Sequence, residues 1–242
     1  GLAKLKQVAL GAQQCTALLE TDPQLYSIYS QGHILSDFAF VDRLAEQTWV
    51  EALSAAPSLR VTLDLDPAQR ASADAPFIYL ASCNQLYLER FGPLFVQACD
   101  AAGIDTVVHF HVVDPTAVTP ATIAALAKGR KHVTVRYSSE TFRRADAGGY
   151  RSASYYACSR FLRAGEIAAF YDRDLLILDM DTGRLGEVTQ IAQAMQTRSL
   201  GYFGCGDVLP WLLCRAAAVY IRQSEAGTAF RALLGRYIAS KI

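Results

Sequence analysis

The segment 174-DLLILDMDTG-183 joins a run of apolar residues to two aspartates, Asp179 and Asp181, which are one residue apart. A continuous apolar run of this length is typical of a strand that is buried on both faces of a parallel sheet. The two carboxylates therefore follow the carboxyl end of the expected strand, which is where open α/β sheets bind their ligands. The segment predicts a polar site at the edge of an apolar sheet.

Strands and helices alternate along the chain that precedes this segment. Apolar runs predict strands at 77–83, 106–114, 132–137 and 174–181, and intervening stretches predict helices at 87–103, 119–129 and 153–167. Thr119 is expected to cap the second of these helices, because Pro120 follows it and proline favours the first helical turn. Strands that alternate with helices of this length form βαβ units, so we predict an α/β domain with a mostly parallel sheet.

Residues 1–70 have a different pattern, in which apolar positions recur at helical spacing among Ala, Leu and Gln. Pro23 and Pro57 follow two of the expected helices and lie 34 residues apart, which is the period of a tetratricopeptide repeat. This segment therefore resembles the degenerate last repeat of such an array, which would offer a surface for a protein partner. An ordinary helical hairpin fits the same pattern equally well.

Two domains are therefore expected, a helical segment at 1–70 and an α/β domain at 76–242. The stretch 60–75, at the boundary of the two, holds a second Asp-x-Asp pair, Asp64 and Asp66, followed directly by a proline. Proline has no N–H to donate to a sheet, so this stretch predicts a linker or an edge strand that ends at the proline.

Composition excludes several classes of protein. Lys plus Arg and Asp plus Glu are both 23, and this balance argues against nucleic acid as the main partner, because phosphate binding needs a basic excess. The six cysteines form no CxxC pair, which predicts reduced thiols in a cytoplasmic protein. No apolar stretch has the length of a membrane span, and the first residues lack the long apolar region of a signal peptide.

The two carboxylates of the Asp-x-Asp pair are candidate ligands for a metal ion. Asp179 and Asp181 supply the hard oxygen ligands that Mg²⁺ and Mn²⁺ prefer, and both ions usually keep positions for substrate phosphates. A pair that only faces solvent beside the loop at 182–183 is the simpler alternative. A phosphatase of the haloacid-dehalogenase type also uses an Asp-x-Asp, but its lysine motif follows downstream, where this chain has only Lys241.

The segment ASYYACSRFLRAGEIAAFYDRDLLILDMDT, residues 153–182, resembles one branch of the nucleotide-sugar-dependent glycosyltransferases. In the family 8 branch of the GT-A fold, an aromatic-rich helix with an arginine leads into a strand that ends in a metal-binding D-x-D. The resemblance extends over about residues 76–235 and is looser outside this segment. It implies a GT-A, Rossmann-like fold behind the N-terminal helical segment, with glycosyl transfer as the activity.

The resemblance also implies roles for individual residues. Asp179 and Asp181 would bind Mn²⁺ or Mg²⁺ and, through it, the diphosphate of a nucleotide-diphosphate sugar. Arg160 would lie near the sugar nucleotide, while Ser82 and Asn84, in the turn after the first strand, would lie beside the base and ribose.

The acceptor side is less defined. Asp207, which follows closely spaced glycines, is a candidate catalytic base toward an acceptor hydroxyl, and the acceptor itself could be a glycan, a lipid or a protein. The four histidines all precede the D-x-D, and no third metal ligand is assigned. A degenerate transferase domain that serves as a scaffold, with the helical segment as a binding module, is therefore a second hypothesis.

Two further features have both structural and functional interpretations. His109 and His111 are two residues apart on an expected strand and hence on one face of it, and their valine neighbours favour a core position over a metal site. The polar segment 138–152 contains three arginines, which predicts either a lid over a diphosphate or a solvated loop.

Overall fold

A computed structural model of the chain describes residues 63–65, 75–142, 152–181, 190, 194–195, 197–204 and 214–241. Nearly all of them belong to one compact unit that comprises residues 56–203 and 215–242. The predicted tetratricopeptide-like segment at 1–70 lies outside the described residues except for 63–65.

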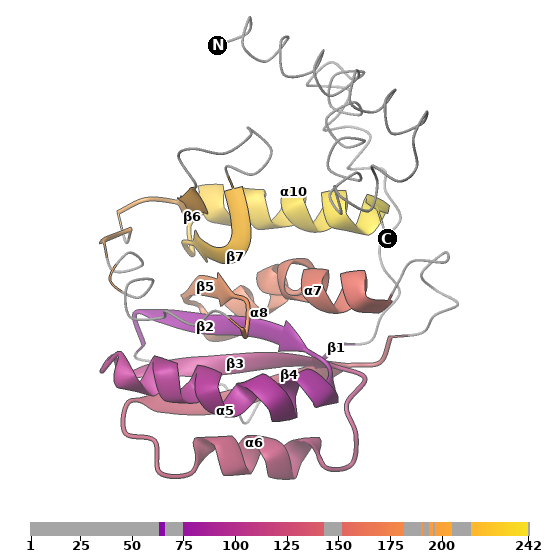
Figure 1. The fold of residues 1–242 in the computed structure, drawn as a ribbon. Helices are drawn as coiled ribbons and strands as arrows, with labels where there is room; N and C mark the ends of the chain where they lie inside the picture. The colour runs from indigo at the N-terminus through magenta and orange to yellow at the C-terminus, as the bar shows by residue number, and fades with distance from the viewer. Residues whose placement is uncertain are drawn as a thin grey trace, which may run out of the picture. The chain divides into compact units, whose positions relative to one another are not determined.

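The described strands form one mixed sheet in the order β1-β4-β3-β2-β5-β7-β6 (Figure 1). The four strands β4, β3, β2 and β5 are parallel, whereas β1 runs antiparallel to β4 and β7 antiparallel to β5. The predicted α/β class with a mostly parallel sheet is thus confirmed. The strands are β1 (Leu63–Asp64), β2 (Phe77–Cys83), β3 (Thr106–Val113), β4 (Val133–Glu140), β5 (Asp174–Leu178), β6 (Leu200–Gly204) and β7 (Cys214–Ile221).

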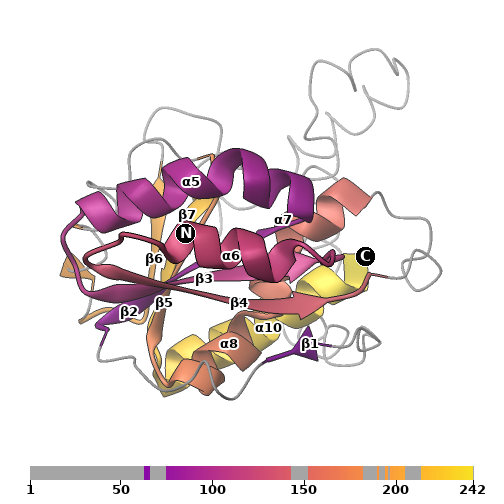
Figure 2. The same cartoon turned by 90° about the horizontal axis from the view of Figure 1, so that it is seen from below.

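Helices cover both faces of the parallel strands. Figures 1 and 2 show α5 (Gln85–Ala101) and α6 (Thr119–Ala127) on one face. The opposite face carries α7 (Ser152–Leu162), α8 (Ala164–Tyr171) and α10 (Glu225–Lys241). None of the helices in the described part of the chain is both long enough and apolar enough to cross a membrane.

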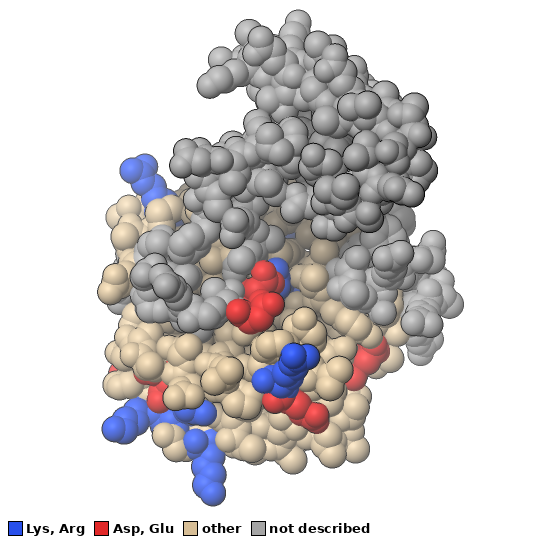
Figure 3. All heavy atoms as spheres, in the orientation of Figure 1, with Lys and Arg blue, Asp and Glu red and all other residues tan. Residues whose placement is uncertain are grey.

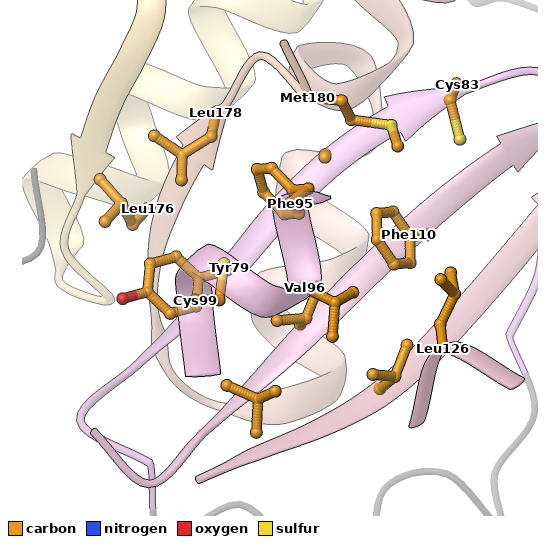
Figure 4. Packing of buried hydrophobic residues seen from close by; sticks show 14 of the residues in the cluster. Tyr79, Cys83, Phe95, Val96, Cys99, Phe110, Leu126, Leu176, Leu178 and Met180 are labelled. Carbon is orange, nitrogen blue, oxygen red and sulfur yellow. The ribbon is translucent and has the colours of Figure 1, made fainter. Parts of the chain in front are cut away.

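Each face of the sheet has its own hydrophobic core, because successive strand residues point to opposite faces. On β2, Phe77 and Tyr79 belong to the core under α5 and α6, whereas Ile78 and Leu80 belong to the core on the other face. Figure 4 shows the first core, where the ring of Phe95 from α5 lies close to residues of the sheet. Burial on both faces explains why the central strands read as continuous apolar runs.

Several boundaries differ from the sequence prediction. The helix predicted at 153–167 is two helices, α7 and α8, and the break lies at Arg163, whose side chain bonds a buried carboxylate. Thr119 does not cap α6; it is the first helical residue, and its hydroxyl accepts a hydrogen bond from the N–H of Thr116. The strand predicted at 174–181 ends at Leu178.

The predicted edge strand is present at Leu63–Asp64, where β1 pairs with the carboxyl end of β4. Asp66, the second member of that Asp-x-Asp pair, lies outside the described residues. The predicted unpaired thiols are found at Cys83, Cys99 and Cys158. Burial raises the pKa of each of these thiols.

One side chain ties the end of α5 to the start of β4. The Oδ1 atom of Asp100 accepts hydrogen bonds from the backbone N–H groups of Lys131, His132 and Val133 at 2.9, 2.7 and 3.2 Å. These bonds, led by the one from His132, hold the pKa of Asp100 below its usual value. The carboxylate satisfies three backbone donors at the point where the chain enters the third parallel strand.

We expect Asp100→Ala to lower the free energy of unfolding by roughly 1 kcal/mol at pH 7, a modest figure because the carboxylate lies near solvent. The folded-state pKa is depressed, so this contribution is present above the pKa of about 3.9 in the unfolded chain and is lost as the pH falls through the folded-state value. Urea unfolding at pH 7 and pH 3 measures the difference. Asp100→Asn, which keeps an acceptor oxygen, should lose less, and equal stability of all three proteins at pH 7 would contradict the assignment.

Candidate functional site

The order of the strands creates a switch point between β2 and β5. The chain runs from β2 outward to β3 and β4, then crosses back to place β5 on the other side of β2. In open α/β sheets, the connections at such a point leave the strand ends in opposite directions, and ligands bind in the crevice that remains.

A cavity of about 380 Å³ lies at this place. Its lining comes from the end of β2 and the start of α5, from α7, and from the residues after β5. All five residues predicted to hold a nucleotide-sugar donor line this cavity: Ser82, Asn84, Arg160, Asp179 and Asp181. Their role as donor ligands stays a prediction, but the fold brings together residues that lie up to 99 positions apart in the sequence.

Arg160 and Asp179 form an ion pair in the lining of the cavity. The arginine side chain is 6% exposed and the aspartate side chain 35% exposed, and the guanidinium carbon also lies 5.0 Å from the centre of the Phe161 ring. Asp181 is exposed. Acidic and basic atoms lie side by side near the middle of the face that Figure 3 shows.

Two of the residues predicted to bind the donor also make hydrogen bonds between or within the elements that line the cavity. Asn84 is the N-cap of α5, and its Oδ1 atom accepts a hydrogen bond from the N–H of Tyr87 at 2.9 Å. This cap explains why α5 begins at Gln85, two residues earlier than predicted. The hydroxyl of Ser82 donates to the carbonyl of Tyr156 at 2.7 Å and thereby joins β2 to α7.

The donor set at the end of β5 fits a hard divalent cation that arrives with phosphate. Asp179 and Asp181 supply carboxylate oxygens, and the described residues contain no cluster of three His, Cys, Asp or Glu side chains that could bind a metal alone. Mg²⁺ commonly binds through one or two carboxylates together with substrate phosphates and water. The two aspartates are therefore the residues that would hold the ion.

The face of β3 opposite α5 carries two buried histidines, as the sequence predicted. The ring of His109 lies 2.8 Å from both the Tyr171 hydroxyl and the Ser138 hydroxyl. His111 lies 2.9 Å from the same serine hydroxyl through Nδ1 and 3.1 Å from Glu140 through Nε2. The Ser138 hydroxyl therefore bridges the two histidine rings inside the protein. The histidines are core residues within the described structure.

Glu140 connects the hydrogen-bonded histidines of β3 to α7, the helix that lines the cavity. Its carboxylate accepts hydrogen bonds from the Tyr155 hydroxyl at 2.6 Å and from Nε of Arg163 at 2.8 Å. Burial alone would raise the pKa of Glu140, but the contacts with His111, Arg163 and Tyr155 hold it below its usual value. Tyr155 and Arg163 flank Arg160 in sequence, so these bonds fix the stretch of α7 that faces the cavity.

Asp114 provides a second attachment for α7. This residue follows β3 with a φ of 55°, in the left-handed region that Asp tolerates better than most residues. Its two carboxylate oxygens accept from the N–H of Phe142 at 2.8 Å and from the hydroxyl of Tyr156 at 3.1 Å. Tyr156 lines the cavity, so the end of β3 helps to position the wall of the site.

Sequence reasoning missed Glu140, Tyr155, Arg163 and Asp114 as residues that support the site. The pair of histidines on one apolar strand was the available signal, because buried polar groups need partners. Asp207 and the three arginines of the predicted lid lie outside the described residues. No family model matches the sequence, and no curated protein matches it significantly.

Removing the charge of Glu140 should destabilise the fold strongly. Glu140→Gln leaves the 8%-exposed Arg163 without its main counter-ion, and breaking a buried pair typically costs about 3 to 5 kcal/mol. Urea unfolding measures the loss. The double variant Glu140→Gln with Arg163→Met removes both charges and should recover part of it. Additive losses in the double variant would show that the two side chains do not form an energetically coupled pair.

The buried histidine predicts a loss of stability in acid. Burial, with a smaller effect of His111, lowers the pKa of His109 from 6.5 to about 3. Between these values the unfolded chain binds a proton and the folded protein does not, so stability falls as the pH falls from about 6.5 toward 3, by roughly 1.4 kcal/mol per pH unit. In His109→Gln this dependence should be absent. Unfolding free energies at pH 7, 6, 5 and 4 test it, and parallel curves for the two proteins would contradict it.

Proposed function

We propose that the chain is a metal-dependent glycosyltransferase of GT-A type that moves a sugar from a nucleotide-diphosphate donor to an acceptor. One observation carries the proposal. Two carboxylates after β5, a buried guanidinium from α7 and polar groups from the end of β2 surround one cavity at the switch point of a mostly parallel sheet. Nucleotides bind at switch points of this kind in other α/β proteins.

The charges around the cavity suit a diphosphate that carries a divalent cation. Asp179 and Asp181 would hold Mn²⁺ or Mg²⁺, and the ion would supply positive charge beside the diphosphate. Arginine recognises phosphate through two parallel N–H groups, and Arg160 is the arginine that lines the described cavity. A phosphatase of the haloacid-dehalogenase type would need a lysine near the first aspartate, and the described lining contains none.

Polar and aromatic groups in the same lining suit a nucleoside. Tyr87 lines the cavity and remains 46% exposed, so its ring can accept a stacked base. Its ring packs 4.8 Å from that of Phe91, which limits the orientations that it can adopt. Asn84, the N-cap of α5, lines the same cavity.

In the proposed reaction the bond between the anomeric carbon of the sugar and the diphosphate oxygen breaks. A bond from an acceptor hydroxyl oxygen to that carbon forms, and the hydroxyl proton passes to a base, a role that we propose for Asp207. The metal, when bound, neutralises charge on the leaving diphosphate. Arg160 holds the diphosphate in place, and the rigid ends of β2 and β5 fix the two halves of the donor relative to each other. The acceptor would be a glycan, a lipid or a protein.

A thermal-shift screen of nucleotide-diphosphate sugars, with and without Mn²⁺, tests the proposal. A donor at 100 times its Kd should add about 2.7 kcal/mol of stability, which raises the Tm of a chain of this size by several degrees. The shift should require Mn²⁺, and the double variant Asp179→Asn with Asp181→Asn should abolish it.

The matched control is Asp172→Asn, because Asp172 lies at the opposite end of β5 with a φ of 53° that asparagine also tolerates. It should leave the shift unchanged. If no nucleotide sugar raises the Tm with metal present, the transferase proposal fails and the scaffold hypothesis takes its place. A shift that survives loss of both aspartates would mean that the donor binds elsewhere.

A further inference from the structure

Arg160 already occupies one of the two carboxylates that would hold the metal. The guanidinium is paired with Asp179, whereas Asp181 is exposed and makes no ion pair with another described residue. Burial of the arginine side chain, at 6% exposure, reduces the competition from water for this pair. A cation that enters the cavity therefore finds one carboxylate accessible and the other engaged.

The charges of the lining explain why neither ligand should bind well alone. Two carboxylates and one guanidinium give the described lining a single net negative charge. A divalent cation alone must approach the guanidinium at Asp179, and a diphosphate alone must approach the carboxylates. When both are present, the cation can bind the two carboxylates while the guanidinium binds the phosphate oxygens. Each charged group then contacts a group of opposite charge.

We propose that Arg160 is an electrostatic gate that makes metal and nucleoside diphosphate bind cooperatively. In the empty site its guanidinium holds Asp179 and weakens metal binding; with a diphosphate present it changes partner and leaves both aspartates to the metal. The proposal rests on the function proposed above and adds the order of events at the site. Coupling between two ligands is reciprocal, so the metal must strengthen diphosphate binding by the same factor.

The surroundings of α7 favour a change of partner by the side chain alone. Tyr155 and Arg163 are bonded to Glu140, and Tyr156 is bonded to Asp114. These bonds hold the helix on both sides of Arg160. The guanidinium can therefore exchange one anionic partner for another at the cavity while the backbone of the helix stays in place.

The first experiment measures Mn²⁺ affinity in the absence of nucleotide, by electron paramagnetic resonance of the free ion or by calorimetry. Arg160→Gln should bind Mn²⁺ on the order of tenfold more tightly than the unaltered protein, because Asp179 is released and a nearby positive charge is removed. Arg160→Lys keeps the charge and should stay near the original affinity. Arg90→Gln removes an exposed arginine of α5 that does not line the cavity and should change nothing.

The second experiment repeats the Mn²⁺ titration with uridine, guanosine or adenosine diphosphate present, corrected for the metal–nucleotide complex in solution. In the unaltered protein the effective nucleotide should tighten Mn²⁺ binding by about tenfold, and in Arg160→Gln this factor should fall toward one. Asp179→Asn should weaken Mn²⁺ binding in both backgrounds.

The outcomes separate the gate from the proposed function. Mn²⁺ affinity that is unchanged or weaker in Arg160→Gln overturns the gate, even if nucleotide sugars bind with metal. Tighter binding with an unchanged nucleotide effect also overturns it, because the coupling then does not pass through Arg160. If no nucleotide binds, the proposed function fails. The Mn²⁺ affinities of Arg160→Gln and the unaltered protein then decide by themselves whether Arg160 competes with the metal for Asp179.

Discussion

Glu140 places a carboxylate where water does not reach, and the protein around it is arranged to compensate that charge. His111, Tyr155 and Arg163 each contact it, from β3, from α7 and from the break between α7 and α8. A buried charge without such partners would cost several kcal/mol, so these elements are held in one relative position. The side of α7 that carries Arg160 consequently faces the ends of β2 and β5.

The site itself combines rigid and adjustable parts. Its carboxylates and the N-cap of α5 follow directly from β5 and β2, whose backbones are hydrogen-bonded on both sides within the sheet. Rigid strand ends fix the positions of polar groups with little loss of entropy when a ligand binds. In the gate that we propose, the adjustable part is the long side chain of Arg160, which is paired with Asp179 in this structure. A site with fixed carboxylates and a movable guanidinium suits an anionic ligand that binds together with a cation.

Much of the fold followed from the sequence because the parallel strands are buried on both faces. The continuous apolar runs at 77–83 and 106–113 and the pair of carboxylates after 174–178 were visible as patterns. The break of the predicted helix at Arg163 was not, because a long-range bond to Glu140 involves the residue at the break. The strands β6 and β7 and the helix α10 were not among the predicted elements.

The sequence alone determined which groups stand at the ends of strands, since the period of a strand and the length of an apolar run are local properties. It also indicated that His109 and His111 share one face of β3. Only the tertiary structure decided that Arg160 pairs with Asp179 and that Ser82 and Asn84 border the same cavity. These juxtapositions depend on the crossover that places β5 beside β2. A crossover is a contact between distant parts of the chain, which no local pattern of residues encodes.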